Sequence, residues 1–515
     1  MFYQFNVEKQ DRDFLRFLWW NKGDDKPADF RMTVHLFGAT SSPGCANFGL
    51  KQAANDFEME FGSEAANFVR NNFYVDDGLL SVKTDEEAIS LIENTKKLLA
   101  KCGLRLHKFL SNSNTVIESV PVVDRAKVLQ NHDLFFEDSP VERCLGLQWC
   151  IESDTFQFRI CLKDQPLTRR GILSTVSSIY DPLGLISPVI LVGKQILQEL
   201  CRAHNDWDSD IPDILRFQWE KWRSSLSQLA DVKIERCYKP KDFGDIVVNE
   251  LHHFSDASTF GYGQCSYLRL IDNNSNVSCS LVMSKSRVTP LKPITIPRLE
   301  LAAALVSVRV SLQLRRELNY SNLTEVFWSD SKVVLGYINN DARRFQMFVA
   351  NRIQQIRESS NPTQWRYIKS KDNLADLASR GVTAEELNAT KWFIGPDFLW
   401  KSQLPSTSDN PEEMHVNISS DDPELKKVQS LATNAKPCFE LSRLNHISDW
   451  FKAKRVIALC LRFKAILLSK DKDNHVRTVK LLVGDKKLNA KGKRVYPRSV
   501  LERPIQKLIL ILEHE

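Results

Sequence analysis

The sequence predicts a multidomain protein that joins an α/β part to α+β parts. The chain has 515 residues, and a single hydrophobic core stops growing well below this length, so two to four domains are expected. Hydrophobic residues make up 43% and charged residues 26% of the chain, which is typical of globular and not of disordered proteins. Between residues 246 and 384, strand-like alternation gives way to alternating helical and strand patterns, which predicts a mixed sheet covered by helices.

The first 120 residues mix helical stretches with short strands. Residues 41–61 begin with a Ser-Ser-Pro-Gly turn and continue as a helix. Residues 84–103 have the spacing of an amphipathic helix with a capping threonine or aspartate before it and a glycine after it. Residues 71–82 predict two short strands that turn at Asp-Asp-Gly.

Residues 121–245 contain a predicted strand pair near 145–160 and then helices, in which Trp207, Trp219 and Trp222 indicate a packed helical unit. The following segment starts with three predicted strands. These are followed by a helix over 298–317, a strand over 324–329, two more helices and a strand over 364–369.

The order weakens after residue 385. Residues 401–427 are polar and rich in Pro, Ser and Asp, which predicts a linker, and a short amphipathic segment follows around 449–468. Residues 471–515 hold eleven Lys and Arg against six Asp and Glu, with strand-like runs. The chain thus divides into five predicted segments: 1–120, 121–245, 246–384, 385–470 and 471–515.

Composition narrows the class of partner only slightly. The net charge is +6 and the pI is near 8.6, which is compatible with a polyanionic partner without establishing one. Eleven scattered cysteines without a CxxC pair favour reduced thiols in an intracellular protein. The most apolar stretch, 183–200, contains Pro188, Lys194 and Glu199, so we expect a core helix and no membrane contact. Without a targeting signal at the start, the cytoplasm is the default location, with nuclear access as the alternative.

Four acidic residues lie where burial makes a carboxylate costly. Asp256 follows the apolar run LHHFS, and Asp330 ends the buried-strand pattern TEVFWSD. Glu300 lies one turn into the helix PRLELAAALVSV, and Asp376 lies among small and apolar residues in DNLADLASRG. Any one of these acids alone is explained by a helix cap or a surface charge. The four together, in this order, favour a shared site.

A pair of divalent cations would resolve the cost of crowding these acids. Burying an unpaired carboxylate costs several kcal/mol, and neighbouring carboxylates raise one another's pKa. Mg²⁺ prefers hard oxygen ligands, with Mn²⁺ as an alternative, and two ions about 4 Å apart can stabilise the attacking water and the leaving oxygen in phosphodiester cleavage.

The motifs FSDAS, PRLELAAAL, FWSDSKVVL and WRYIKSKDNLADLASRG resemble the ribonuclease H domain of BEL/Pao-type retrotransposon polyproteins. The resemblance implies that Asp256, Glu300, Asp330 and Asp376 are catalytic metal ligands. It also implies that the substrate is the RNA strand of an RNA–DNA hybrid, with Arg298 as a nucleic-acid contact. Many members of the wider family carry a histidine near the last acid, whereas no histidine lies between residues 254 and 414 here.

The hairpin sequence FYVDD resembles the polymerase hairpin of reverse transcriptases. By this resemblance Asp76 and Asp77 are catalytic acids, Asp76 is a metal ligand, and Tyr74 contacts nucleic acid; on the residues alone, an exposed Asp-Asp-Gly turn is an equally good reading. Upstream and downstream motifs of the same family place nucleic-acid contacts at Gly44 and Lys108. The family's third acid lies before the segment that matches the start of this chain, so we expect no polymerase activity.

The resemblance also gives roles to the five segments. It implies a partial palm without fingers over 1–120, a thumb or connection over 121–245 and the ribonuclease H-like domain over 246–384. A linker and pre-integrase segment over 385–470 would lead to a small β-rich integrase remnant over 471–515, without strand-transfer activity. Three hypotheses stay open from the sequence: a nuclease, a remnant that binds nucleic acid without turnover, and a pseudogene product. Oligomeric state is not predictable from these features.

Overall fold

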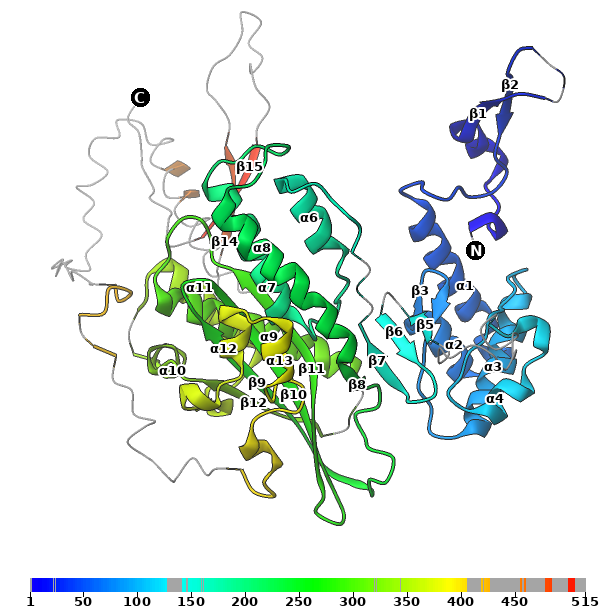
Figure 1. The fold of residues 1–515 in the computed structure, drawn as a ribbon. Coiled ribbons are helices and arrows are strands. Elements are labelled where there is room, and N and C mark those ends of the chain that lie inside the picture. Colours follow the sequence, from blue (N-terminus) through cyan, green and yellow to red (C-terminus); the bar gives the residue numbers. More distant parts are fainter. Residues whose placement is uncertain are drawn as a thin grey trace, which may run out of the picture. The chain divides into compact units, whose positions relative to one another are not determined.

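The computed structural model describes residues 2–126 except 22 and 24, residues 141–404 except 145–146, 159, 161, 319, 321 and 343, and residues 418–426 except 420. Further along it describes only 454–455, 458–459, 478–483 and 499–504. The chain divides into two compact units, Met1–Lys427 and Val428–Glu515. Figure 1 shows the helices and strands of the described residues. In the second unit, β14 (Thr478–Val483) pairs antiparallel with β15 (Ser499–Pro504). The remainder of the predicted integrase remnant lies outside the described residues.

A five-stranded mixed sheet carries the predicted α/β part. Its strand order is β11-β10-β9-β12-β13. The first three strands in the chain pair antiparallel, whereas β12 runs parallel to both β9 and β13. The strands are β9 (Ile246–Ala257), β10 (Gly261–Asp272), β11 (Val277–Val288), β12 (Thr324–Ser329) and β13 (Trp365–Tyr367). The sequence prediction of three strands followed by helix–strand alternation is confirmed.

Helices cover both faces of this sheet, because successive side chains of each buried strand point to opposite sides. Leu251 and Phe327 face one layer of helices, whereas Phe254 and Trp328 face the other. The first layer consists of α9 (Ile296–Glu317), α10 (Lys332–Asn339) and α11 (Met347–Ser359). The second includes α7 (Ser187–Arg202), α12 (Ala375–Arg380) and α13 (Ala384–Asn388).

The hydrophobic core on the second face of the sheet includes residues from outside the predicted segment 246–384, both before residue 246 and after residue 384. Ile186 and Trp222 from the N-terminal side and Trp392 and Leu399 from the C-terminal side belong to the same core as Phe254. The apolar stretch 183–200 forms the core helix α7, flanked by α6 (Arg169–Ser178) and α8 (Asp213–Ser225). None of the helices in the described part of the chain has the length and apolarity that crossing a membrane requires.

Two expectations outside the sheet are wrong. The sequence predicts that Trp207 packs with Trp219 and Trp222, but the Trp207 side chain is exposed and lies under the guanidinium of Arg169. The second expectation was a linker over 401–427, whereas its described residues 418–426 dock on the first helical layer. Leu425 forms a β-bridge with Phe345, and both belong to or pack against the core of that layer.

The N-terminal part has a small helical core of its own. Helices α1 (Ser42–Phe61), α2 (Ser63–Asn71) and α3 (Asp85–Ala100) pack around it. The predicted hairpin is present as β3 (Phe73–Tyr74) and β4 (Asp77–Gly78). Its turn consists of Val75 and Asp76 and not of Asp-Asp-Gly, because Val75 takes the positive φ of 58°.

The remaining α-helix and strands lie before the five-stranded sheet in the chain. They are β1 (Arg16–Trp19), β2 (Ala28–Arg31), α4 (Asn114–Ser119), β5 (Val141–Cys144), β6 (Leu147–Cys150), β7 (Thr155–Gln157) and β8 (Lys233–Glu235).

Candidate active site

The two strand-borne acids lie side by side because of the sheet register. Asp256 is the penultimate residue of β9, and Asp330 directly follows β12. The strands are parallel, and Ser329 pairs with Ser255, so the residue after each serine lies at the same edge of the sheet. This is the edge at which carboxyl ends of parallel strands meet, where ligand sites commonly lie in α/β sheets.

Two helices bring the other acids to the same edge. Glu300 lies one turn into α9, and Asp376 lies in the first turn of α12. Burial and then the neighbouring charges of Asp330 and Asp376 raise the pKa of Asp256 to about 7. Burial, with a contribution from Asp330, also raises the pKa of Glu300. The four carboxylates therefore share one electrostatic environment.

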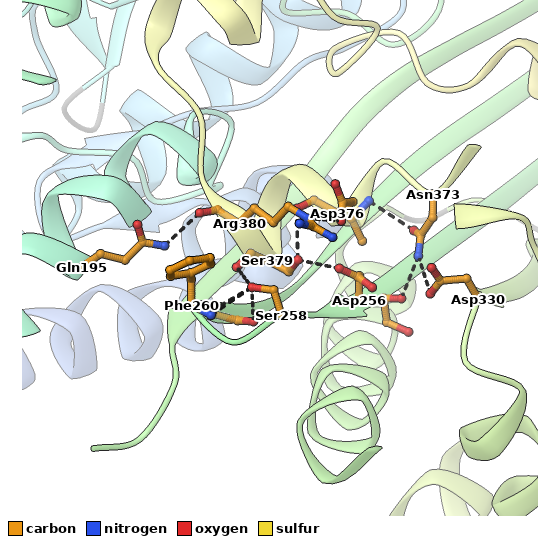
Figure 2. A network of polar contacts seen from close by, with 12 residues as sticks. Gln195, Asp256, Ser258, Phe260, Asp330, Asn373, Asp376, Ser379 and Arg380 are labelled. Atoms are coloured by element: carbon orange, nitrogen blue, oxygen red, sulfur yellow. Dashed lines mark hydrogen bonds and ion pairs between the residues drawn. The ribbon is translucent and has the colours of Figure 1, made fainter. Parts of the chain in front are cut away.

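Each carboxylate accepts a hydrogen bond from a protein donor. The hydroxyl of Ser379 donates to Asp256 at 2.5 Å (Figure 2), and the hydroxyl of Ser331 donates to Glu300 at 2.5 Å. The amide of Asn373 donates to Asp330 at 3.1 Å, and Nε of Arg380 donates to Asp376 at 2.5 Å. Three of these four donors come from one short segment, residues 373–380.

The donor set suits a divalent cation chemically, since it offers up to eight carboxylate oxygens in a partly buried position. In the described part of the chain, however, no three acidic, histidine or cysteine side chains converge on one point at metal-binding distance. The carboxylates point to their protein donors instead. Metal binding at this edge therefore requires the carboxylates to rotate away from these hydrogen bonds.

Asn373 is a site residue that the sequence analysis did not single out. Its side chain is buried, and its amide nitrogen donates to both Asp330 and the backbone oxygen of Ser255. Its amide oxygen accepts from the backbone N–H of Ala375 at the start of α12. Asn373 thus ties β9, the end of β12 and α12 together. The sequence signal for Asn373 is its position three residues before Asp376, because an asparagine at this distance lies next to the start of the helix that carries Asp376.

Asn373→Ala is expected to destabilise the protein by about 1–3 kcal/mol, because it leaves the buried Ser255 carbonyl and the Ala375 N–H without their partner. Chemical denaturation at pH 7 measures this loss. Asn361→Ala is a matched control, since Asn361 caps a short helix at an exposed position. Equal losses for the two variants would contradict the bridging role of Asn373.

The hairpin acids form a separate group. Asp76 and Asp77 are exposed, and burial and the charge of Asp76 raise the pKa of Asp77, while Lys108 lowers it. Tyr74 is 66% exposed on β3, and Gly44 is exposed in the first turn of α1. Asp76 and Asp77 therefore lie on a hairpin distinct from the five-stranded sheet, and Lys108 lies close enough to this hairpin for its charge to affect Asp77.

Arg298, expected to contact nucleic acid, is already engaged by the chain. Its guanidinium forms two hydrogen bonds with Glu424, the shorter one at 2.6 Å, and lies over the ring of Phe348. Glu424 is buried within the docked residues 418–426. The side chain of Arg298 keeps an exposed fraction of 36%, so part of the guanidinium still reaches solvent.

Comparisons with known proteins find one matching family model and several similar solved structures. Residues 168–331 match a family model described as a Pao retrotransposon-like RNaseH-like domain. No curated protein matches the chain. Similar solved structures include the N-terminal RNase H domain of a Mycobacterium tuberculosis protein fused to maltose-binding protein (9% identity, 28% of this chain and 96% of that chain, TM-score 0.19). A second is RNase H1 from Halobacterium salinarum (9% identity, 28% of this chain and 98% of that chain, TM-score 0.17). A third is LC11-RNase H1 in complex with an RNA/DNA hybrid (11% identity, 27% of this chain and 99% of that chain, TM-score 0.20). The family match supports a retrotransposon-type ribonuclease H-like region in this part of the chain.

Proposed function

We propose that the five-stranded sheet with its helices is a metal-dependent endonuclease that cuts the RNA strand of an RNA–DNA hybrid. The observation that carries this proposal is the shared edge of β9 and β12. There the register places Asp256 beside Asp330, with Glu300 and Asp376 in the same electrostatic environment. The family match over residues 168–331 supports the same activity.

In the proposed mechanism, the carboxylates of Asp256, Glu300, Asp330 and Asp376 would hold Mg²⁺. Two bound ions would supply the positive charge that activates a water and stabilises the leaving oxygen of a phosphodiester. The chain itself contributes a fixed frame: β9 and β12 set the spacing of Asp256 and Asp330, and Asn373 fixes the start of α12 against both.

Burial of Asp256 makes metal binding at the site depend on pH. Because the pKa of Asp256 is raised to about 7, a large fraction of this carboxyl is protonated at neutral pH and cannot bind a cation. Metal affinity should therefore rise between pH 6 and pH 8 as the proton leaves. Bound cations would in turn lower this pKa by favouring the charged form.

The activity is tested with a hybrid that carries separate labels on its RNA and DNA strands. In the presence of Mg²⁺ we expect internal cuts in the RNA strand and an intact DNA strand, with no cutting when EDTA replaces the metal. Single-stranded RNA and duplex DNA of the same sequence serve as substrate controls. Tight binding of the hybrid without any metal-dependent cleavage would reject the nuclease and leave a nucleic-acid-binding protein.

A further inference from the structure

Arg380 lies at the edge of the four acids, with a hydrogen-bonded backbone and a largely exposed side chain. It is the last residue of α12, and its backbone oxygen accepts a hydrogen bond from Gln195 of α7 at 2.9 Å (Figure 2). Gly381, with a φ of 82°, ends the helix directly after it. The side chain of Arg380 is 63% exposed. The backbone is thus anchored while the guanidinium can reorient in solvent.

The guanidinium is electrostatically linked to three of the four acids. Its Nε contacts Asp376 at 2.5 Å, and the charges of Asp376, Asp256 and Asp330 all raise its pKa. Among the residues that the structure describes, Arg380 is the only cation that forms an ion pair with any of the four acids. A guanidinium has five N–H donors in a planar fork that suits phosphate oxygens, and one of them is used here.

The contact between Arg380 and Asp376 is easily broken. The two residues are four apart on a helix, and the side chains of Arg380 and Asp376 are 63% and 40% exposed. Exposed pairs of this kind change an equilibrium constant by only about twofold. A divalent cation bound by Asp376 would compete for the same carboxylate oxygens and repel the guanidinium. Metal binding and the Arg380 contact with Asp376 therefore oppose one another.

We propose that Arg380 is a phosphate-binding residue of the nuclease site that is held back by Asp376 until metal binds. This inference rests on the proposed function. In the metal-free protein Arg380 serves as counter-ion of the acids. With metal bound, the guanidinium is released from Asp376 and binds a phosphate of the nucleic-acid strand that lies over the acids. Arg380 thus weakens metal binding in the absence of nucleic acid and strengthens nucleic-acid binding in the presence of metal.

The test compares Arg380→Gln with wild type in two measurements. The first is hybrid binding, with Ca²⁺ in place of Mg²⁺ to prevent turnover, and again with EDTA. We expect Arg380→Gln to weaken binding about tenfold with Ca²⁺, the loss of one charged hydrogen-bond donor, and by less than about twofold with EDTA. The second is a Mn²⁺ titration without nucleic acid, followed by calorimetry, in which Arg380→Gln should bind the ion about two- to threefold more tightly.

Two further variants separate this role from a general charge effect. Arg316→Gln removes an arginine that is also exposed, from the last turn of α9, and it should behave like wild type in the Mn²⁺ titration. Arg380→Lys keeps the charge without the planar fork, and it should restore part of the hybrid affinity with Ca²⁺. A loss of hybrid affinity that is equal with Ca²⁺ and EDTA, or unchanged or weaker Mn²⁺ binding by Arg380→Gln, would overturn the proposal.

Failure of the underlying function gives a different pattern. If wild type binds neither Ca²⁺ nor Mn²⁺ at the acids, the nuclease proposal fails and the role of Arg380 fails with it. If wild type binds metal and hybrid while Arg380→Gln matches it in both measurements, only the role of Arg380 fails.

Discussion

Asp256→Asn is expected to abolish cleavage while making the metal-free protein more stable at pH 8. Burial and the neighbouring acids raise the pKa of Asp256 from 3.8 to about 7. The folded protein therefore keeps a proton that the unfolded chain releases between these two values, and stability falls as the pH rises through this window. Above pH 7 the full cost is present, about 4 kcal/mol. Asparagine carries no charge, so the variant avoids this cost.

Urea unfolding at pH 5 and pH 8, with EDTA present, measures this effect. Wild type should lose stability between the two pH values more steeply than Asp256→Asn. Glu325→Gln is a control of opposite sign. Although burial raises the pKa of Glu325, its contact with His253 and its hydrogen bonds from Ser311 and Arg315 outweigh burial and lower this pKa to about 2. That variant should be less stable than wild type at pH 8. A destabilised Asp256→Asn protein at pH 8 would refute the electrostatic account of the site.

Residues 246–384 alone are expected not to fold, whereas residues 168–426 should unfold cooperatively. The shorter fragment lacks α7 and α8, which cover Phe254 and Trp328 on one face of the sheet. It also lacks Leu399, whose backbone oxygen accepts from the buried guanidinium of Arg269. Arg269 keeps its ion pair with Glu250 in the shorter fragment, but a buried donor that loses its acceptor costs about 1–3 kcal/mol, and exposing the apolar face adds a larger loss.

Circular dichroism with thermal unfolding compares the two fragments. The longer fragment should show one cooperative transition, and the shorter one should show none and should bind a hydrophobic dye. Trp392→Ala in the longer fragment gives an intermediate case, since it removes a fully buried side chain that bonds to the Leu185 oxygen and should cost about 3–5 kcal/mol. A folded fragment of residues 246–384 would contradict the shared core.

The sheet and the placement of its acids could be predicted from the sequence because both depend on local pattern. Alternation defined the strands, and Asp256 and Asp330 were placed at strand ends that the register brings together. Partners from distant segments could not be predicted in this way. The apolar stretch 183–200 was recognised as a core helix, but nothing in it indicates that it packs against Phe254.

The remaining differences arise where a few contacts override composition. Residues 418–426 are polar enough to look like a linker, but Leu425 and the pair of Glu424 with Arg298 dock them on the helices. The donors Asn373, Ser379 and Arg380 became recognisable only once α12 lay against β9. Their helical spacing around Asp376 is visible in the sequence, although the acids that they hold are not.

We propose that Asp256, Glu300, Asp330 and Asp376 form one metal site, and calorimetric titration with Mn²⁺ at pH 8 tests this claim most directly. The wild-type protein should bind the ion, and Asp256→Asn/Asp330→Asn should lose this binding while remaining folded. As a matched control, Asp76→Asn/Asp77→Asn should leave it unchanged, because these acids lie on the separate β3–β4 hairpin. Equal Mn²⁺ binding by wild type and Asp256→Asn/Asp330→Asn would contradict the claim.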